Sequence, residues 1–65
     1  MTWYVTYLLI FPNGSTEESV ESFAYNPTGI DINDVGGQIA EQMGATTFVA
    51  SRGKRNWNGE WIDYE

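Results

Sequence analysis

The segment from Trp3 to Phe11 (WYVTYLLIF) is dominated by aromatic and β-branched side chains. This composition is typical of a β-strand. Asn13-Gly14 follows it, and Asn-Gly between two strand-like segments is the strongest short-range signal for a β-hairpin. The more polar segment 16–25 is therefore predicted to be the return strand of a hairpin.

The register of this hairpin decides which side chains share a face of the sheet. With Asn13-Gly14 as a two-residue turn, Tyr7 is predicted to lie opposite Val20. The predicted core face then holds Trp3, Val5, Tyr7, Leu9, Phe11, Val20 and Ala24. The other face holds Tyr4, Thr6, Leu8, Ile10, Glu17, Ser19, Glu21 and Phe23. A slip of one residue would exchange the two faces of the return strand.

The pattern changes to a helical period after the break at Asn26–Gly29. Apolar residues recur at helical spacing, at Ile32, Val35, Ile39 and Met43. Asp31 is the predicted N-cap, and Gly44 suits the left-handed residue that ends a helix. Gly36-Gly37 interrupts this helix at a cost of about 1 kcal/mol per glycine relative to alanine. The pair either lets the helix lie close to an aromatic side chain of the sheet, or forms a hinge or partner surface.

Two further strands are predicted after the helix. Residues 45–51 (ATTFVAS) form one of them, and a second Asn-Gly turn at Asn58-Gly59 introduces the last, residues 60–64. The predicted fold is a single α+β domain over residues 1–65 with the order ββαββ. It consists of a four-stranded antiparallel sheet, built from two Asn-Gly hairpins, with one helix packed on one face.

Charge is distributed unevenly along the chain. The net charge is −6, and residues 1–50 contain six carboxylates and no basic residue. All three bases, Arg52, Lys54 and Arg55, fall in the last quarter. A two-residue turn at Asn58-Gly59 would place Lys54 opposite Asp63 and Arg52 opposite Glu65. Phosphate binding requires several uncompensated cations, so direct binding to nucleic acid is not expected.

Composition removes most catalytic chemistry. The chain contains no cysteine and no histidine, which excludes thiolate or histidine nucleophile systems and the commonest metal ligands. The carboxylate pairs lack the spacing of an EF-hand, and no glycine-rich phosphate loop is present. We therefore expect no enzymatic activity, no metal and no cofactor. The segment 1–4 lacks the basic start of a signal peptide, and no apolar run could span a bilayer, so a cytoplasmic protein without membrane contact is expected.

What remains is a surface for another protein. Apolar side chains on the predicted non-core face, rimmed by carboxylates, are typical of an interaction site, and an exposed Trp beside an Arg is typical of a binding hot spot. The candidate partner-binding residues are Tyr4, Leu8, Ile10, Glu17, Glu18, Glu21, Phe23, Arg55 and Trp57. In size and charge the chain resembles the small inhibitors that bacteriophages and other mobile elements direct against host nucleic-acid enzymes.

The leading hypothesis is an inhibitor or modulator that occupies the basic surface of a nucleic-acid-handling protein. One alternative is a structural, self-assembling homodimer with no enzymatic partner. A third is a binder of RNA or of a small ligand through Trp57, Trp61 and Arg55.

Overall fold

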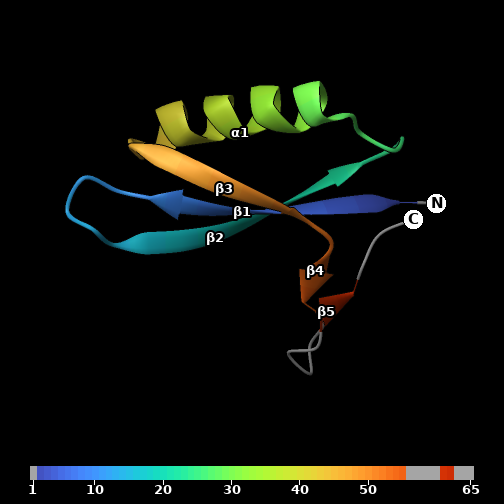
Figure 1. Ribbon diagram of the computed structural model, residues 1–65, viewed down its shortest axis with the longest axis horizontal. Helices are drawn as coiled ribbons and strands as arrows, with labels where there is room; N and C mark the ends of the chain where they lie inside the picture. The colour runs from blue at the N-terminus through green and yellow to red at the C-terminus, as the bar shows by residue number, and fades with distance from the viewer. Residues whose placement is uncertain (1, 56–60, 63–65) are drawn as a thin grey trace.

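The protein forms a three-stranded antiparallel sheet with one helix across one face (Figure 1). The computed structural model describes residues 2–55 and 61–62, with side chains for residues 2–54. Its elements, in chain order, are β1 (Trp3–Ile10), β2 (Thr16–Phe23), α1 (Gly29–Met43), β3 (Thr47–Arg52), β4 (Lys54–Arg55) and β5 (Trp61–Ile62). The strand order is β2-β1-β3, so α1 connects two strands that lie on either side of β1.

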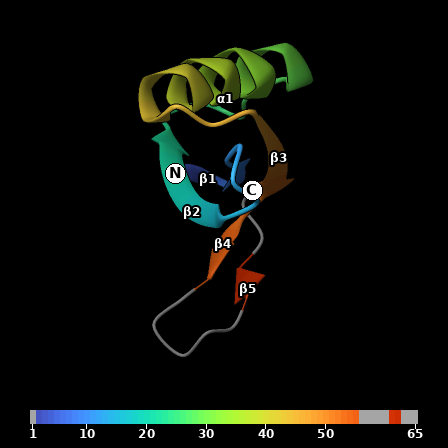
Figure 2. The same cartoon turned by 90° about the vertical axis from the view of Figure 1, so that its left-hand side faces the viewer.

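The predicted four-stranded ββαββ sheet is wrong. Strands β4 and β5 pair only with each other among the described residues, and they extend from the side of the sheet opposite α1 (Figure 2). The chain leaves the sheet at Gly53, whose φ of +110° breaks the extended backbone between β3 and β4. The Gly53 N–H donates to Tyr4 O at 2.7 Å, and its carbonyl accepts from Thr6 Oγ1 at 2.7 Å. These two hydrogen bonds hold Gly53 against β1 where the chain leaves the sheet.

The register of the second hairpin also differs from the prediction by one residue. Lys54 lies opposite Ile62 rather than Asp63, and Arg55 lies opposite Trp61. Arg52 belongs to β3 and is paired with Val5 of β1. The turn residues Asn58-Gly59 and the predicted partners Asp63 and Glu65 lie outside the described residues.

The first hairpin has a three-residue loop rather than a two-residue turn. The Phe11 N–H donates to Ser15 O at 2.9 Å, and the Gly14 N–H donates to Phe11 O at 2.9 Å. A two-residue turn would have required an N–H from Pro12, and proline has none. Instead Pro12 and Asn13 form the tight turn, and Gly14 takes the left-handed position that follows it, with φ +87°.

This slip moves every residue of β2 to the opposite face from the one predicted. Tyr7 lies opposite Ser19, and Trp3 lies opposite Phe23. Phe23 is therefore buried in the core, whereas Val20 is 48% exposed. Ala24, also assigned to the core, is exposed just beyond the end of the strand. The predicted assignment of β1 is confirmed: its core face consists of Val5, Tyr7 and Leu9, each fully buried.

The N-cap of the helix lies three residues before the predicted one, and the helix begins at Gly29. Thr28 is the N-cap: its hydroxyl accepts from the Asp31 N–H at 3.2 Å, and the Asp31 carboxylate accepts from the Thr28 N–H at 3.3 Å. This reciprocal capping box satisfies two backbone donors that the helix would otherwise leave open. Asp31 thus stabilises the helix start from its first turn. The predicted end is confirmed, since Gly44 adopts the left-handed conformation with φ +77°.

Gly36 lets the helix lie directly on an aromatic ring of the sheet. A β-carbon at Gly36 would lie 2.6 Å from Cζ and 2.8 Å from Cδ2 of Phe48 on β3, and closer still to Cε2. The Phe48 ring in turn packs edge-on against Tyr7 of β1, with centroids 5.8 Å apart. For Gly36, this confirms the interpretation that a missing side chain lets the helix lie close to an aromatic side chain of the sheet. Gly37 has no such neighbour, because a β-carbon there would meet nothing within 4 Å.

These two adjacent glycines should respond oppositely to the same substitution. Gly36→Ala overpacks the Phe48 contact and is expected to lower the free energy of unfolding by about 1–3 kcal/mol. Gly37→Ala meets open space and gains helix propensity, so it is expected to raise that free energy by about 0.5–1 kcal/mol. Urea denaturation of the two variants measures both changes. Equal effects of the two substitutions would contradict the close contact at Gly36.

Candidate protein-interaction surface

The predicted candidate surface is divided between the two faces of the sheet. Glu17 and Glu21 lie opposite the buried residues Leu9 and Val5, so they project on the same side as α1. Tyr4, Leu8 and Ile10 project on the other side, together with Glu18. The single apolar strip rimmed by carboxylates therefore does not exist. The structure instead has an acidic side that faces the helix and an apolar open face.

Glu21 is the carboxylate most closely associated with the core. It is half-buried beside Tyr7, whose hydroxyl donates to the Ile32 carbonyl of α1 at 2.7 Å. Burial raises the pKa of Tyr7 to about 12, and the negative charge of Glu21 contributes to the increase. A tyrosine held neutral in this way keeps its proton for the bond to the helix.

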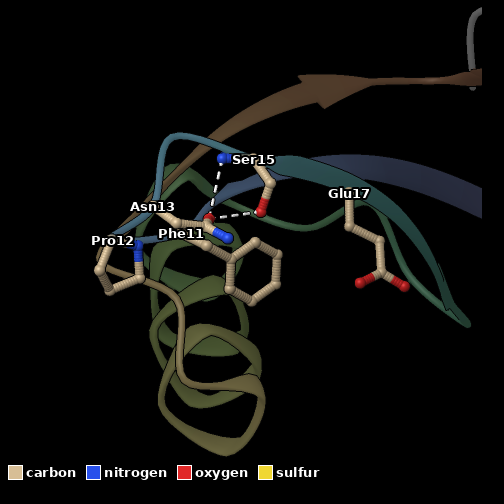
Figure 3. Close-up of a pocket in the computed structure, with 5 residues that line it drawn as sticks. All are labelled: Phe11, Pro12, Asn13, Ser15 and Glu17. Atoms are coloured by element: carbon tan, nitrogen blue, oxygen red, sulfur yellow. Dashed lines mark hydrogen bonds between the residues drawn. The ribbon is translucent and has the colours of Figure 1, made fainter.

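A shallow hollow lies at the loop end of the acidic side. It has a volume of about 450 Å³ and is lined by Phe11, Pro12, Asn13, Ser15 and Glu17. The Phe11 ring and the Glu17 carboxylate lie on the same side of the hairpin (Figure 3). Asn13 Oδ1 accepts from the Ser15 N–H at 3.0 Å and from its hydroxyl at 2.7 Å, which holds the loop in shape. The hollow combines an apolar wall with a negative charge.

The helix carries the remaining acidic residues of the described region. Asp34 and Glu41 are exposed on α1. Desolvation raises the pKa of Tyr25, and the charge of Asp31 and hydrogen bonding to it add to the increase. The segment after β2 therefore lies close to the helix start. Five of the six carboxylates of the described region therefore lie on the helix side of the sheet, Glu18 being the exception.

Each of the two basic side chains that the structure describes has an uncharged contact within the described residues. Arg52 donates from Nη1 to the Pro27 carbonyl at 3.1 Å and to Asn26 Oδ1 at 3.5 Å. Lys54 Nζ lies over the Tyr4 ring, 3.7 Å from its centroid, in a cation–π contact. Lys54 thus occupies the open face, away from Glu17 and Glu21.

The open face has an apolar centre on three neighbouring strands. Leu8 and Ile10 are half-buried on β1, and Val20 on β2 and Val49 on β3 are 48% and 54% exposed. Leu8 lies opposite Val49 in the β1–β3 pair, so the apolar side chains are contiguous across β1 and β3. Val20 and Val49 were missed by the sequence analysis. Their exposure depends on registers that the sequence pattern predicted wrongly for β2 and did not address for β3.

The remaining predicted residues are either buried in the core or outside the part of the chain that the structure describes. Phe23 belongs to the core, with only 9% of its surface exposed, and cannot contact a partner. Trp57 and the side chains of Arg55 and Trp61 lie outside the described residues. Within residues 2–55 and 61–62, no group of three or more potential ligands could hold a metal ion, and no helix is long and apolar enough to cross a membrane.

Comparisons with protein-family models, with curated proteins and with solved structures found no match for this chain.

The environment of Tyr7 gives stability a specific pH dependence. Below pH 10 this tyrosine is protonated in both states; between pH 10 and about 12 only the unfolded chain releases the proton, so the free energy of unfolding falls in that window. Tyr7→Phe should cost about 1 kcal/mol at neutral pH, since it removes the bond to Ile32, and should reduce the alkaline loss. Urea denaturation along a pH series tests both effects. Tyr4→Phe, on the opposite face of the sheet, is the control, because it keeps the ring that Lys54 covers. An alkaline loss in Tyr7→Phe as steep as in the unmodified chain would contradict the assignment.

Proposed function

We propose that this protein is a small acidic protein-binding module that docks onto a basic surface of another protein through the helix side of β2 and α1. The observation that carries the proposal is the segregation of charge. Five of the six described carboxylates lie on that side with one described base, Arg52, whose guanidinium bonds to Asn26 and Pro27, while Lys54 is held on the opposite face by Tyr4. A predominantly negative surface attracts a positive one and accelerates their encounter.

The arrangement along β2 gives this surface a defined spacing. Glu17 and Glu21 lie on the same side of one strand, about 13–14 Å apart at a rise of about 3.4 Å per residue. Strand β2 is at the edge of the sheet, so both carboxylates can approach a partner without obstruction from a further described strand. The Phe11 side of the hollow supplies an adjacent apolar contact. Together they offer charge for attraction and apolar area for affinity.

The partner we propose is a nucleic-acid-handling protein, with the carboxylates occupying positions that phosphates otherwise take. The effect would be inhibition or modulation by occupancy, without chemistry of the module's own. The net charge of −6 and the absence of cysteine and histidine support this class. The resemblance in size and charge to phage-encoded inhibitors points to the same class of target.

Two variants with the same change in net charge test the surface. Glu17→Gln with Glu21→Gln, and Glu18→Lys alone, each reduce the net charge from −6 to −4. The double variant should weaken partner binding about twofold to thirtyfold, because each exposed charge contributes roughly 0.2–1 kcal/mol. Glu18→Lys, on the opposite face, should change it little. Partners are isolated from bacterial lysate with the unmodified chain, and their affinities are then measured by titration.

Competition with nucleic acid tests the class of partner. Duplex DNA or RNA should displace the isolated partner from the module, and raised salt should weaken the complex. In the variant test, equal losses of affinity in the Glu17/Glu21 double variant and in Glu18→Lys would show that the partner responds to net charge alone. No loss of affinity in either variant would exclude the proposed surface. A partner that binds equally well with saturating nucleic acid present would contradict the mimicry.

A further inference from the structure

The two edges of the sheet differ in how they are protected. Strand β2 carries three glutamates, a common device that prevents an edge strand from pairing with another chain. Strand β3 (TFVASR) carries no carboxylate, and its one charge, Arg52, stands at its end. In the described part of the chain, β3 has a single neighbouring strand, β1. The β3 edge is therefore the one open to further pairing.

The backbone groups that point outward from β3 follow from the register. The bond from Gly53 N–H to Tyr4 O makes Gly53 and Tyr4 a hydrogen-bonded pair. Because such pairs alternate along an antiparallel ladder, Thr47, Val49 and Ser51 bond to β1. The N–H and C=O groups of Phe48, Ala50 and Arg52 therefore point away from the sheet. Ala50 is the middle one of the three.

The helix flank above this edge carries a glycine between larger side chains. Successive residues of an α-helix are about 100° apart around its axis. Gly36 rests on Phe48 of β3, and Asp31 reaches Tyr25 beside β2, so Gly37 projects from the flank beyond β3. Asn33 precedes Gly37 by four residues and Glu41 follows it by four, and Ile30, 75% exposed, lies seven residues before it on the same flank. A β-carbon at Gly29 or at Gly37 would meet nothing within 4 Å in the chain itself.

We propose that the occupant of this edge is a second copy of the chain, paired antiparallel through β3 with Ala50 on the two-fold axis. Ala50 then faces its counterpart, and Phe48 faces Arg52 of the other copy, so all three outward residues exchange two hydrogen bonds each with the residue opposite. The sheet becomes a continuous six-stranded sheet. The two α1 helices lie side by side over the seam, where the exposed Ile30 and Gly37 share the facing flank, and a long side chain at position 37 would separate the helices.

Charge favours this pairing over the alternative edge. Pairing through β2 would bring the three glutamates of each copy together in a chain that already carries −6. Pairing through β3 places the two β2 strands at the far ends of the combined sheet. The two acidic sides then lie on the same face, at opposite ends of the combined sheet, so a dimer would present two docking surfaces. Raised salt should strengthen the dimer, since it screens the repulsion between two acidic chains.

Sedimentation equilibrium from micromolar to millimolar concentration tests the proposal. The unmodified chain should approach twice its mass of 7.3 kDa. Ala50→Pro removes an outward N–H but no bond to β1, and should give monomers. Gly37→Gln fits the open space of the single chain and improves helix propensity, and it should also give monomers with an unchanged circular dichroism spectrum.

Val20→Pro is the matched control, because it removes an outward N–H from the middle of the other edge, β2. It should leave the dimer intact. If Ala50→Pro fails to fold, Gly37→Gln decides the question alone. A monomer over the whole concentration range would overturn the proposal. So would a dimer that survives Gly37→Gln, or one that dissociates with Leu8→Glu but not with Ala50→Pro, since the open faces would then be the interface.

Discussion

The contact between Gly36 and the Phe48 ring determines how the rest of the molecule is arranged. It brings α1 onto β3, and the Phe48 ring meets Tyr7 of β1 edge-on. With the helix this close to the sheet, the Tyr7 hydroxyl donates a hydrogen bond to the Ile32 carbonyl at 2.7 Å. Helix and sheet are thus connected by one ring, one hydrogen bond and the buried side chains around them. A chain without cysteine has no disulfide to replace this contact.

The position of the helix also gives the two edges of the sheet their different characters. Asp31, at the helix start, lies close to the segment after β2, on the side where Glu17 and Glu21 project. The opposite flank carries Gly37 above β3. One edge is therefore acidic and protected against pairing, and the other, among the described residues, carries Arg52 as its single charge. Attraction of a basic partner would use the β2 side, and pairing with a second copy would use the β3 edge.

Local signals in the sequence were sufficient for several elements. The composition of residues 3–11 predicted β1 and its core face, and the spacing of Ile32 and Ile39 with Gly44 predicted the helix and its end. The errors arose at three positions where a local rule was incomplete. Pro12 cannot donate the bond of a two-residue turn, so β2 slipped; Thr28, not Asp31, capped the helix; and Gly53 turned the last hairpin out of the sheet. Because side chains alternate every residue in a strand, the slip alone moved Glu17 and Glu21 to the helix side and Val20 to the open face.

The sequence by itself determined that the chain is acidic, belongs to the α+β class and lacks histidine and cysteine chemistry. It also predicted the first strand and the helix, and it showed a glycine pair whose role it left open. These features depend on composition and on periods of two and 3.6 residues, which are local properties. Only the tertiary structure decided which carboxylates share a side, which glycine meets an aromatic ring, and which strands form the edges of the three-stranded sheet. Those outcomes depend on register and on contacts between residues far apart in the chain, such as Thr6 with Gly53 and Tyr7 with Ile32. A local pattern does not encode such contacts, because each requires the whole chain to be folded before the two groups can meet.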